Sequence, residues 1–139
     1  MGFIVFLAIF ADLLAPFDYD RVYFDRVLLM PLEHPEHFLG TDEVGRDYLS
    51  RLIYGARTSM TVSLSVQLIA LIIGLPIGAL AGYFGGVFDF VISRIIDIMT
   101  AFPALLFTIL IISVLGGGML TIIVALSITS WIVIARIAR

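Results

Sequence analysis

Residues 58–88 read TSMTVSLSVQLIALIIGLPIGALAGYFGGVF and contain no charged side chain. Residues 98–135 form a second uncharged run. Each run exceeds the roughly 18 apolar residues that suggest a membrane-spanning helix. As one straight helix at about 1.5 Å per residue, the second run would be far longer than a bilayer core of about 30 Å, so we expect it to fold back. Successive glycines can supply that turn, and the sequence predicts helices near 59–83, 90–115 and 119–137, with a turn at 116–118.

The composition of the chain also indicates a membrane protein. Of the 139 residues, 61% are hydrophobic and 14% are charged, and the mean hydropathy is +1.14. An average soluble domain has about half apolar and about a quarter charged residues. A soluble fold of this size could not hide so much apolar surface, because small domains leave a large share of their surface in water. We therefore expect an all-α, polytopic transmembrane helix bundle.

Several functional classes are excluded by residue types that the sequence lacks. The 8 basic residues are all arginines, and with 11 carboxylates the net charge is -3, which removes the electrostatic case for binding nucleic acid. Without cysteine there is no disulfide, thiolate nucleophile or cysteine-bound zinc. Without lysine there is no Walker A loop and no Schiff base. The sequence also lacks a Ser-His-Asp order and an HExxH motif, so it predicts no enzyme, no cofactor and no metal site.

The acidic residues gather in the first third of the chain. Those before residue 48 are Asp12, Asp18, Asp20, Asp25, Glu33, Glu36, Asp42, Glu43 and Asp47. Only Asp89 and Asp97 follow. We therefore expect a solvated acidic loop over residues 17–57 and the start of a membrane core over 58–139.

The N-terminal run is apolar over residues 2–11 and is interrupted by Asp12. Even when extended to Pro16, it is short for a full span. A secretory signal peptide is the alternative, but no basic residue precedes Phe3 and no small-x-small cleavage site follows. We expect residues 1–16 to be part of a first transmembrane helix.

Small residues recur at every fourth position within the first uncharged run. Small side chains at this spacing share one helix face and let a second helix approach closely. Glycine is also common in membrane helices for other reasons, but four small residues in register favour close packing. These residues are Ala70, Gly74, Gly78 and Gly82.

Residues 41–57, TDEVGRDYLSRLIYGAR, have the pattern of an amphipathic helix. Thr41 is a plausible N-cap, and Asp42 and Glu43 then lie in the first turn, where the helix dipole favours negative charge. Apolar residues follow at helical spacing. We expect a helix over 41–57 at the membrane interface, and the alternative is an ordinary amphipathic helix packed on protein.

Two further polar clusters allow more than one interpretation. Arg94 and Asp97 are three residues apart on one helix face and can neutralise each other; we favour a pair that snorkels at the interface over one that lines an intramembrane polar route. Residues 33–37 hold two histidines and two glutamates. Pro35 breaks the helical spacing that would aim both imidazoles at one ion, so we interpret this segment as a solvated loop rather than a metal site.

The order of motifs along the chain is specific. Leu13-Leu14-Ala15-Pro16 is followed by HFLGTDEVGRD at 37–47, SRLIYGAR at 50–57, AGYFGG at 81–86 and DIMTAFP at 97–103. This order resembles the C-type inner-membrane permease subunits of bacterial and archaeal ABC transporters for dipeptides, oligopeptides and nickel. The residues that carry the resemblance most specifically are Gly40, Thr41, Asp42, Gly45, Arg46, Asp47, Ser50, Arg51, Tyr54, Gly55 and Arg57.

The resemblance implies a partial type-1 ABC permease, multi-pass in the cell inner membrane, with residues 17–57 outside the cytoplasm. It implies a chain truncated at both ends, with the ATPase-docking loop beyond Arg139. The implied partners are a B-type permease subunit, cytoplasmic ATPase subunits, an extracytoplasmic solute-binding protein and the lipid bilayer. The implied function is a permease subunit of an ATP-driven importer for peptides or a related small solute such as nickel. The alternative is a small membrane-anchored structural or assembly protein.

The arginines alone favour the opposite orientation. Positive charge is usually enriched in cytoplasmic loops. The implied topology places Arg21, Arg26, Arg46, Arg51 and Arg57 outside and Arg94, Arg136 and Arg139 inside. We follow the resemblance, because the implied cytoplasmic segments lie outside this sequence and would add to the number of positive residues on the cytoplasmic side.

Overall fold

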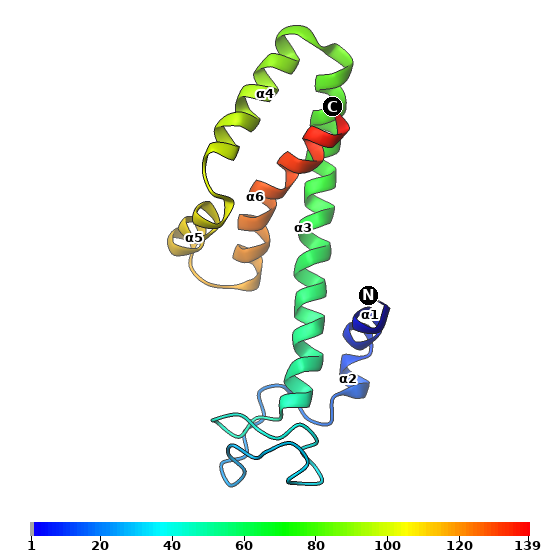
Figure 1. Cartoon of the computed structure of the whole chain (residues 1–139), viewed down its shortest axis with the longest axis vertical. Coiled ribbons are helices and arrows are strands. Elements are labelled where there is room, and N and C mark those ends of the chain that lie inside the picture. Colours follow the sequence, from blue (N-terminus) through cyan, green and yellow to red (C-terminus); the bar gives the residue numbers. More distant parts are fainter. Residues whose placement is uncertain (1) are drawn as a thin grey trace. The chain divides into compact units, whose positions relative to one another are not determined.

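The computed structural model describes residues 2–139, which are helical apart from one long loop and short connections (Figure 1). The described residues contain no β-strand, only isolated bridges between His34 and His37 and between Thr41 and Asp47. The prediction of a mainly helical chain is thus confirmed. The helices are α1 (Gly2–Ile9), α2 (Ala11–Leu14), α3 (Tyr48–Phe84), α4 (Gly86–Ala101), α5 (Ala104–Leu115) and α6 (Met119–Ala138).

The chain divides into two compact units, one ending at Thr61 and one running from Val62 to Arg139. Helices α3 and α6 are each long and apolar enough to cross a membrane. The pair α4 and α5 qualifies as a third span if the two helices are taken together, although they are bent by 80° relative to each other. The structure therefore has two or three candidate spans.

The bend between α4 and α5 differs from the single helix that we expected over 90–115. Helix α4 ends at Ala101, and Phe102 is extended, with φ -93° and ψ 133°. Pro103 explains the break, because its ring disfavours helical backbone at the preceding residue and it has no N–H to donate. At about 1.5 Å per residue, the 12 residues of α5 extend only about 18 Å, so α5 is too short to span a bilayer alone.

Helix α3 also differs from the expectation of a separate helix over 41–57. Residues 41–47 form turns, and a single helix runs from Tyr48 to Phe84. Its 37 residues extend about 55 Å, which exceeds a bilayer core of about 30 Å. The amphipathic segment that we expected to be independent is therefore the first part of the same helix that continues into the uncharged run.

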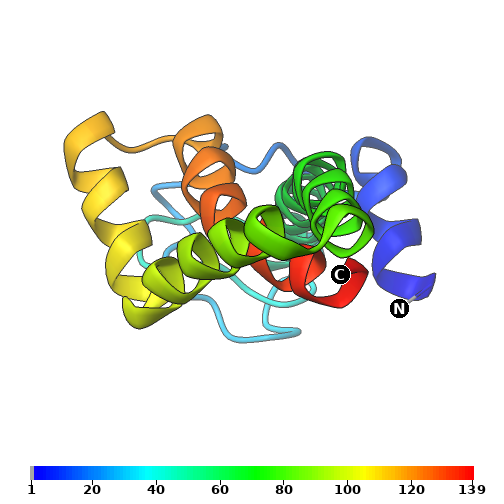
Figure 2. The ribbon, with the colours of Figure 1, turned by 90° about the horizontal axis from the view of Figure 1, so that it is seen from above.

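In the second unit, the chain folds back at the three glycines. Helix α5 ends at Leu115 and α6 begins at Met119. Gly116 has a φ of +87° and Gly118 one of +151°, conformations that side chains disfavour. Figure 2 shows α5 and α6 side by side, joined by this turn. A small core beside them joins α4 to α6 and consists of Ile92, Ile96, Met99, Trp131, Ile132 and Ala135.

Candidate functional site

The motif residues before α3 form its N-terminal cap. Asp47 directly precedes the helix, and its Oδ2 accepts hydrogen bonds from the backbone N–H of Ser50 and from the Ser50 hydroxyl, both at 2.8 Å. A carboxylate here satisfies a helix N–H that would otherwise have no partner. The Ser50 hydroxyl oxygen also accepts from the backbone N–H of Phe17 at 3.1 Å. This buried cluster fixes the loop to the start of α3.

His37 is part of the same cluster, so our prediction of a solvated loop is wrong for this residue. Its side chain is fully buried, and Nδ1 lies 3.0 Å from Oδ1 of Asp47. The rings of Phe17 and Tyr23 lie 5.0 and 5.1 Å from the imidazole, centroid to centroid. These contacts link residues 10 or more positions apart, and no local sequence pattern indicates them. Among residues 2–139, no group of three His, Cys, Asp or Glu side chains is placed to hold a metal ion.

Two motif glycines are required by the path of the loop. Gly40 and Gly45 have φ values of +79° and +83°. A Cβ atom at either position would lie 2.1 Å from a backbone oxygen, that of Leu29 or Tyr23. Between them, Thr41 accepts a hydrogen bond from the N–H of Leu29 at 3.0 Å and donates one to the carbonyl of Arg26. The path of the loop thus leaves no room for a side chain at positions 40 and 45.

Asp42 organises the last turn before α3. Its Oδ1 accepts from the backbone N–H groups of Val44 at 2.9 Å and Arg46 at 2.8 Å, and its Oδ2 pairs with Arg51. Burial acts to raise the pKa of Asp42, but the hydrogen bonds from Arg46 and Val44 and the charge of Arg51 outweigh it, so the pKa lies below its usual value. Asp42 is therefore ionised at neutral pH.

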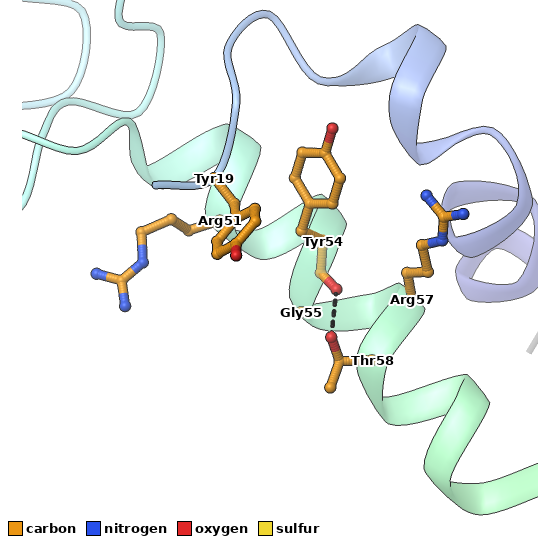
Figure 3. Close-up of a pocket in the computed structure, with 6 residues that line it drawn as sticks. All are labelled: Tyr19, Arg51, Tyr54, Gly55, Arg57 and Thr58. Carbon is orange, nitrogen blue, oxygen red and sulfur yellow. Dashed lines mark hydrogen bonds between the residues drawn. The ribbon is translucent and has the colours of Figure 1, made fainter. Parts of the chain in front are cut away.

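The remaining motif residues lie in the first turns of α3, beside α2. Nη1 of Arg57 lies 2.9 and 2.8 Å from the two carboxylate oxygens of Asp12, and the Tyr54 hydroxyl donates to Asp12 at 3.3 Å. Figure 3 shows a pocket of about 410 Å³ here, with the guanidinium groups of Arg51 and Arg57 directed away from each other. The two arginines therefore serve separate ion pairs. The pocket is lined by Tyr19, Arg51, Tyr54, Gly55, Arg57 and Thr58.

The small residues of α3 lie along α6. A Cβ atom at Gly74, Gly78 or Gly82 would lie 2.5, 2.3 or 2.6 Å from the carbonyl oxygens of Trp131, Ala135 and Arg139, respectively. Ala70 is fully buried one turn earlier. The residue numbers increase in the same direction on both helices, so α3 and α6 run parallel at this seam (Figure 1). The two backbones are in direct contact.

Arg94 and Asp97 form an exposed pair on α4. Their nearest charged atoms are 3.6 Å apart, and both side chains are more than half exposed. A second polar network on this helix was not predicted: Asp89 pairs with Arg139 at 2.6 Å, and Arg139 donates to the Ser93 hydroxyl at 2.6 Å. Ser93 and Asp89 lie 46 and 50 positions before Arg139, so helical spacing could not reveal this network.

Comparison with known proteins shows a similarity to transport proteins. Residues 74–139, a little under half of the chain, match the profile of the family described as binding-protein-dependent transport system inner membrane component. Over these residues the chain is similar to this family. The family is named for inner-membrane components of transport systems.

Three relatives show how far the similarity extends beyond the profile. The di/tripeptide transport system permease protein DppC of Pseudomonas aeruginosa is 42% identical over 100% of this chain and 47% of its own length. The oligopeptide transport system permease protein OppC of Bacillus subtilis is 39% identical over 98% of this chain and 44% of its own length. The glutathione transport system permease protein GsiD of Shigella flexneri is 41% identical over 98% of this chain and 45% of its own length. The chain spans a little under half the length of these relatives, and the similarity includes the loop before α3.

Proposed function

We propose that this chain contributes the first part of the membrane core of a permease subunit in an ATP-driven ABC importer of peptides. The observation that carries the proposal is the 42% identity, over the whole chain, to a di/tripeptide transport permease. The other two relatives described above are named for oligopeptide and glutathione transport. These cargoes all contain peptide bonds, which favours a peptide over nickel as the cargo class.

The proposed architecture is a partial type-1 permease with residues 17–57 outside the cytoplasm. The first turns of α3 then lie at the extracytoplasmic surface of the inner membrane, where Arg51 and Arg57 can remain hydrated. Because α3 and α6 run in the same direction, their C-terminal ends both face the cytoplasm in this orientation. Residues 1–16 belong to a first transmembrane helix, and residues 58–139 begin the permease core.

The proposed partners are a B-type permease subunit, cytoplasmic ATPase subunits and an extracytoplasmic solute-binding protein. The family description itself refers to binding-protein-dependent transport. Transport proceeds by alternating access, in which helices move as rigid bodies around contacts that differ between the states. In this mechanism the seam formed by Ala70, Gly74, Gly78 and Gly82 keeps α3 and α6 together as one moving unit.

Uptake measurements test this proposal. The full-length permease that contains this chain, reconstituted with its partner permease, ATPases and binding protein, should import a labelled dipeptide in an ATP-dependent manner. Omission of the binding protein or mutation of the ATPase nucleotide site should abolish uptake. If none of a panel of di-, tri- and oligopeptides is imported or retained by the binding protein, the peptide assignment is wrong. Normal uptake without this subunit would instead favour the alternative of a membrane-anchored assembly protein.

A further inference from the structure

A small groove containing polar groups lies between α3 and α6 within the uncharged spans. Its volume is about 290 Å³, which is enough to admit water. Two of its polar side chains come from α3 and one from α6. The residues that line it are Val62, Ser63, Val66, Gln67, Leu126 and Ser130.

The position of Gln67 makes this groove unusual. Residue 67 lies nine positions after Thr58, where the uncharged run of α3 begins, and therefore about 14 Å along the helix axis. This depth is inside the hydrocarbon region of a bilayer if the spans are placed by their charges. The side chain is nevertheless exposed. An amide at this depth requires hydrogen-bonding partners, because hydrocarbon supplies none.

Neither Gln67 nor Ser63 finds such a partner within the described residues 2–139. Ser63 lies one turn before Gln67 and is also exposed. Most hydroxyl groups in the spans donate instead to a carbonyl of their own helix, as Thr108, Ser127 and Ser130 do. Two unpaired polar side chains on one face of α3 therefore open toward something outside this chain that can form hydrogen bonds.

We propose that Ser63, Gln67 and Ser130 form a hydrogen-bonding site for the amide groups of the cargo, in a groove that α3 and α6 present to a water-accessible path. This inference rests on the proposed transport function. The Gln67 amide offers both donors and an acceptor, and each hydroxyl oxygen can accept even when its proton is used. Peptide N–H and C=O groups are complementary to this set.

The absence of charge nearby supports an uncharged ligand group. No residue that is charged at neutral pH lies in 58–88 or in 98–135, so a charged terminus of a peptide would find no counter-ion at this groove. Hydrogen bonds alone bind weakly in the presence of water. Weak binding suits a transport path, because a ligand must leave each site as readily as it enters.

Cysteine accessibility tests the site directly, since the chain has no native cysteine. Ser63→Cys and Gln67→Cys are introduced into the full-length permease in its assembled transporter and treated with a small membrane-impermeant methanethiosulfonate. The matched control is Leu68→Cys, because Leu68 is 62% exposed on the same helix but does not line the groove. We expect both groove cysteines to react several-fold faster than the control, and a transported dipeptide to slow the reaction.

Each outcome bears on one assignment. Reaction at 63 and 67 no faster than at 68 would show that lipid or the partner subunit covers the groove and would overturn the proposal. Fast reaction that a transported dipeptide leaves unchanged would overturn the cargo assignment. Gln67→Leu should lower uptake about fivefold, the effect of one ordinary hydrogen bond, whereas Gln67→Asn should retain more uptake at equal membrane abundance.

The same experiment separates this inference from the proposed function. If the unmodified transporter imports no peptide with all its partners present, the proposed function is wrong. If it imports peptide normally while cysteines at 63 and 67 remain unreactive, the function stands and the path lies elsewhere. Equal uptake by Gln67→Leu and the parent would also exclude Gln67 from the path.

Discussion

Gly78 of α3 lies against the carbonyl oxygen of Ala135 on α6, so closely that a Cβ atom at position 78 would sit 2.3 Å from that oxygen. The Cα hydrogens of a glycine can contact a carbonyl at such a seam, and a side chain must push the helices apart. In a membrane, where lipid is as apolar as the side chains, this backbone approach is a principal source of helix association.

Replacement of Gly78 by leucine should therefore disrupt the second unit. We expect a cost of at least about 1–3 kcal/mol from overpacking, seen as a lower melting temperature and a lower yield of the solubilised transporter. Gly78→Ala should show a smaller effect. The matched control is Gly55→Ala, because a Cβ atom at position 55 meets no atom within 4 Å. Parental yield and stability for Gly78→Leu would contradict the close-packing interpretation.

Asp47 provides a test of the loop before α3. Asp47→Ala removes the helix cap, at about 0.5–2 kcal/mol, and leaves the buried His37 and Ser50 side chains without their acceptor, at about 1–3 kcal/mol. We expect the loop to be cleaved faster by protease added to the extracytoplasmic side. Asp20→Ala is the control, because Asp20 is exposed and makes no side-chain hydrogen bond within the described residues. Equal cleavage rates for both variants would count against a buried cluster around His37.

The ionisation of Asp42 predicts how the loop responds to acid. Its pKa is lower in the folded loop than the value of about 3.9 in an unfolded chain. The ionised form therefore stabilises the fold fully above about pH 5, and this contribution is lost as the pH falls through the lower, folded-state pKa. Hydrogen exchange of residues 40–51 should show less protection for Asp42→Asn than for the parent at pH 7. The difference should shrink below about pH 4; a constant difference would contradict the ionic contribution.

The proposed orientation can be measured with single cysteines. Glu36→Cys should react with a membrane-impermeant thiol reagent added to intact cells, whereas Gly86→Cys should react only after the membrane is opened. The opposite pattern would mean that the arginine count indicates the orientation correctly for this chain. Labelling of both positions in intact cells would show that residue 86 is not on the cytoplasmic side.

Hydropathy predicted the helical class and the candidate spans because the residues of a membrane-spanning helix are apolar along its whole length. The same signal could not place helix ends. Thr41 and Asp47 are both capping residues by type, and tertiary contacts of His37 and Phe17 favour Asp47 as the cap of α3. Pro103 was visible in the sequence, but its effect on the 90–115 helix was not anticipated. The burial of His37 depends on contacts distant in sequence, which periodicity does not record.

The seam of α3 and α6 repeats every four residues on both helices, and a repeating interface is nearly self-similar when shifted by one repeat. Glycines have no side chains that would fit at one axial position and clash at the next. Groups that do not repeat can limit such a shift, and the ion pair of Asp89 on α4 with Arg139, together with Ser93, holds the end of α6 against α4, which directly follows α3. The glycines determine how near α3 and α6 come, and the polar contacts of Arg139 with α4 hold the end of α6 against the helix that follows α3.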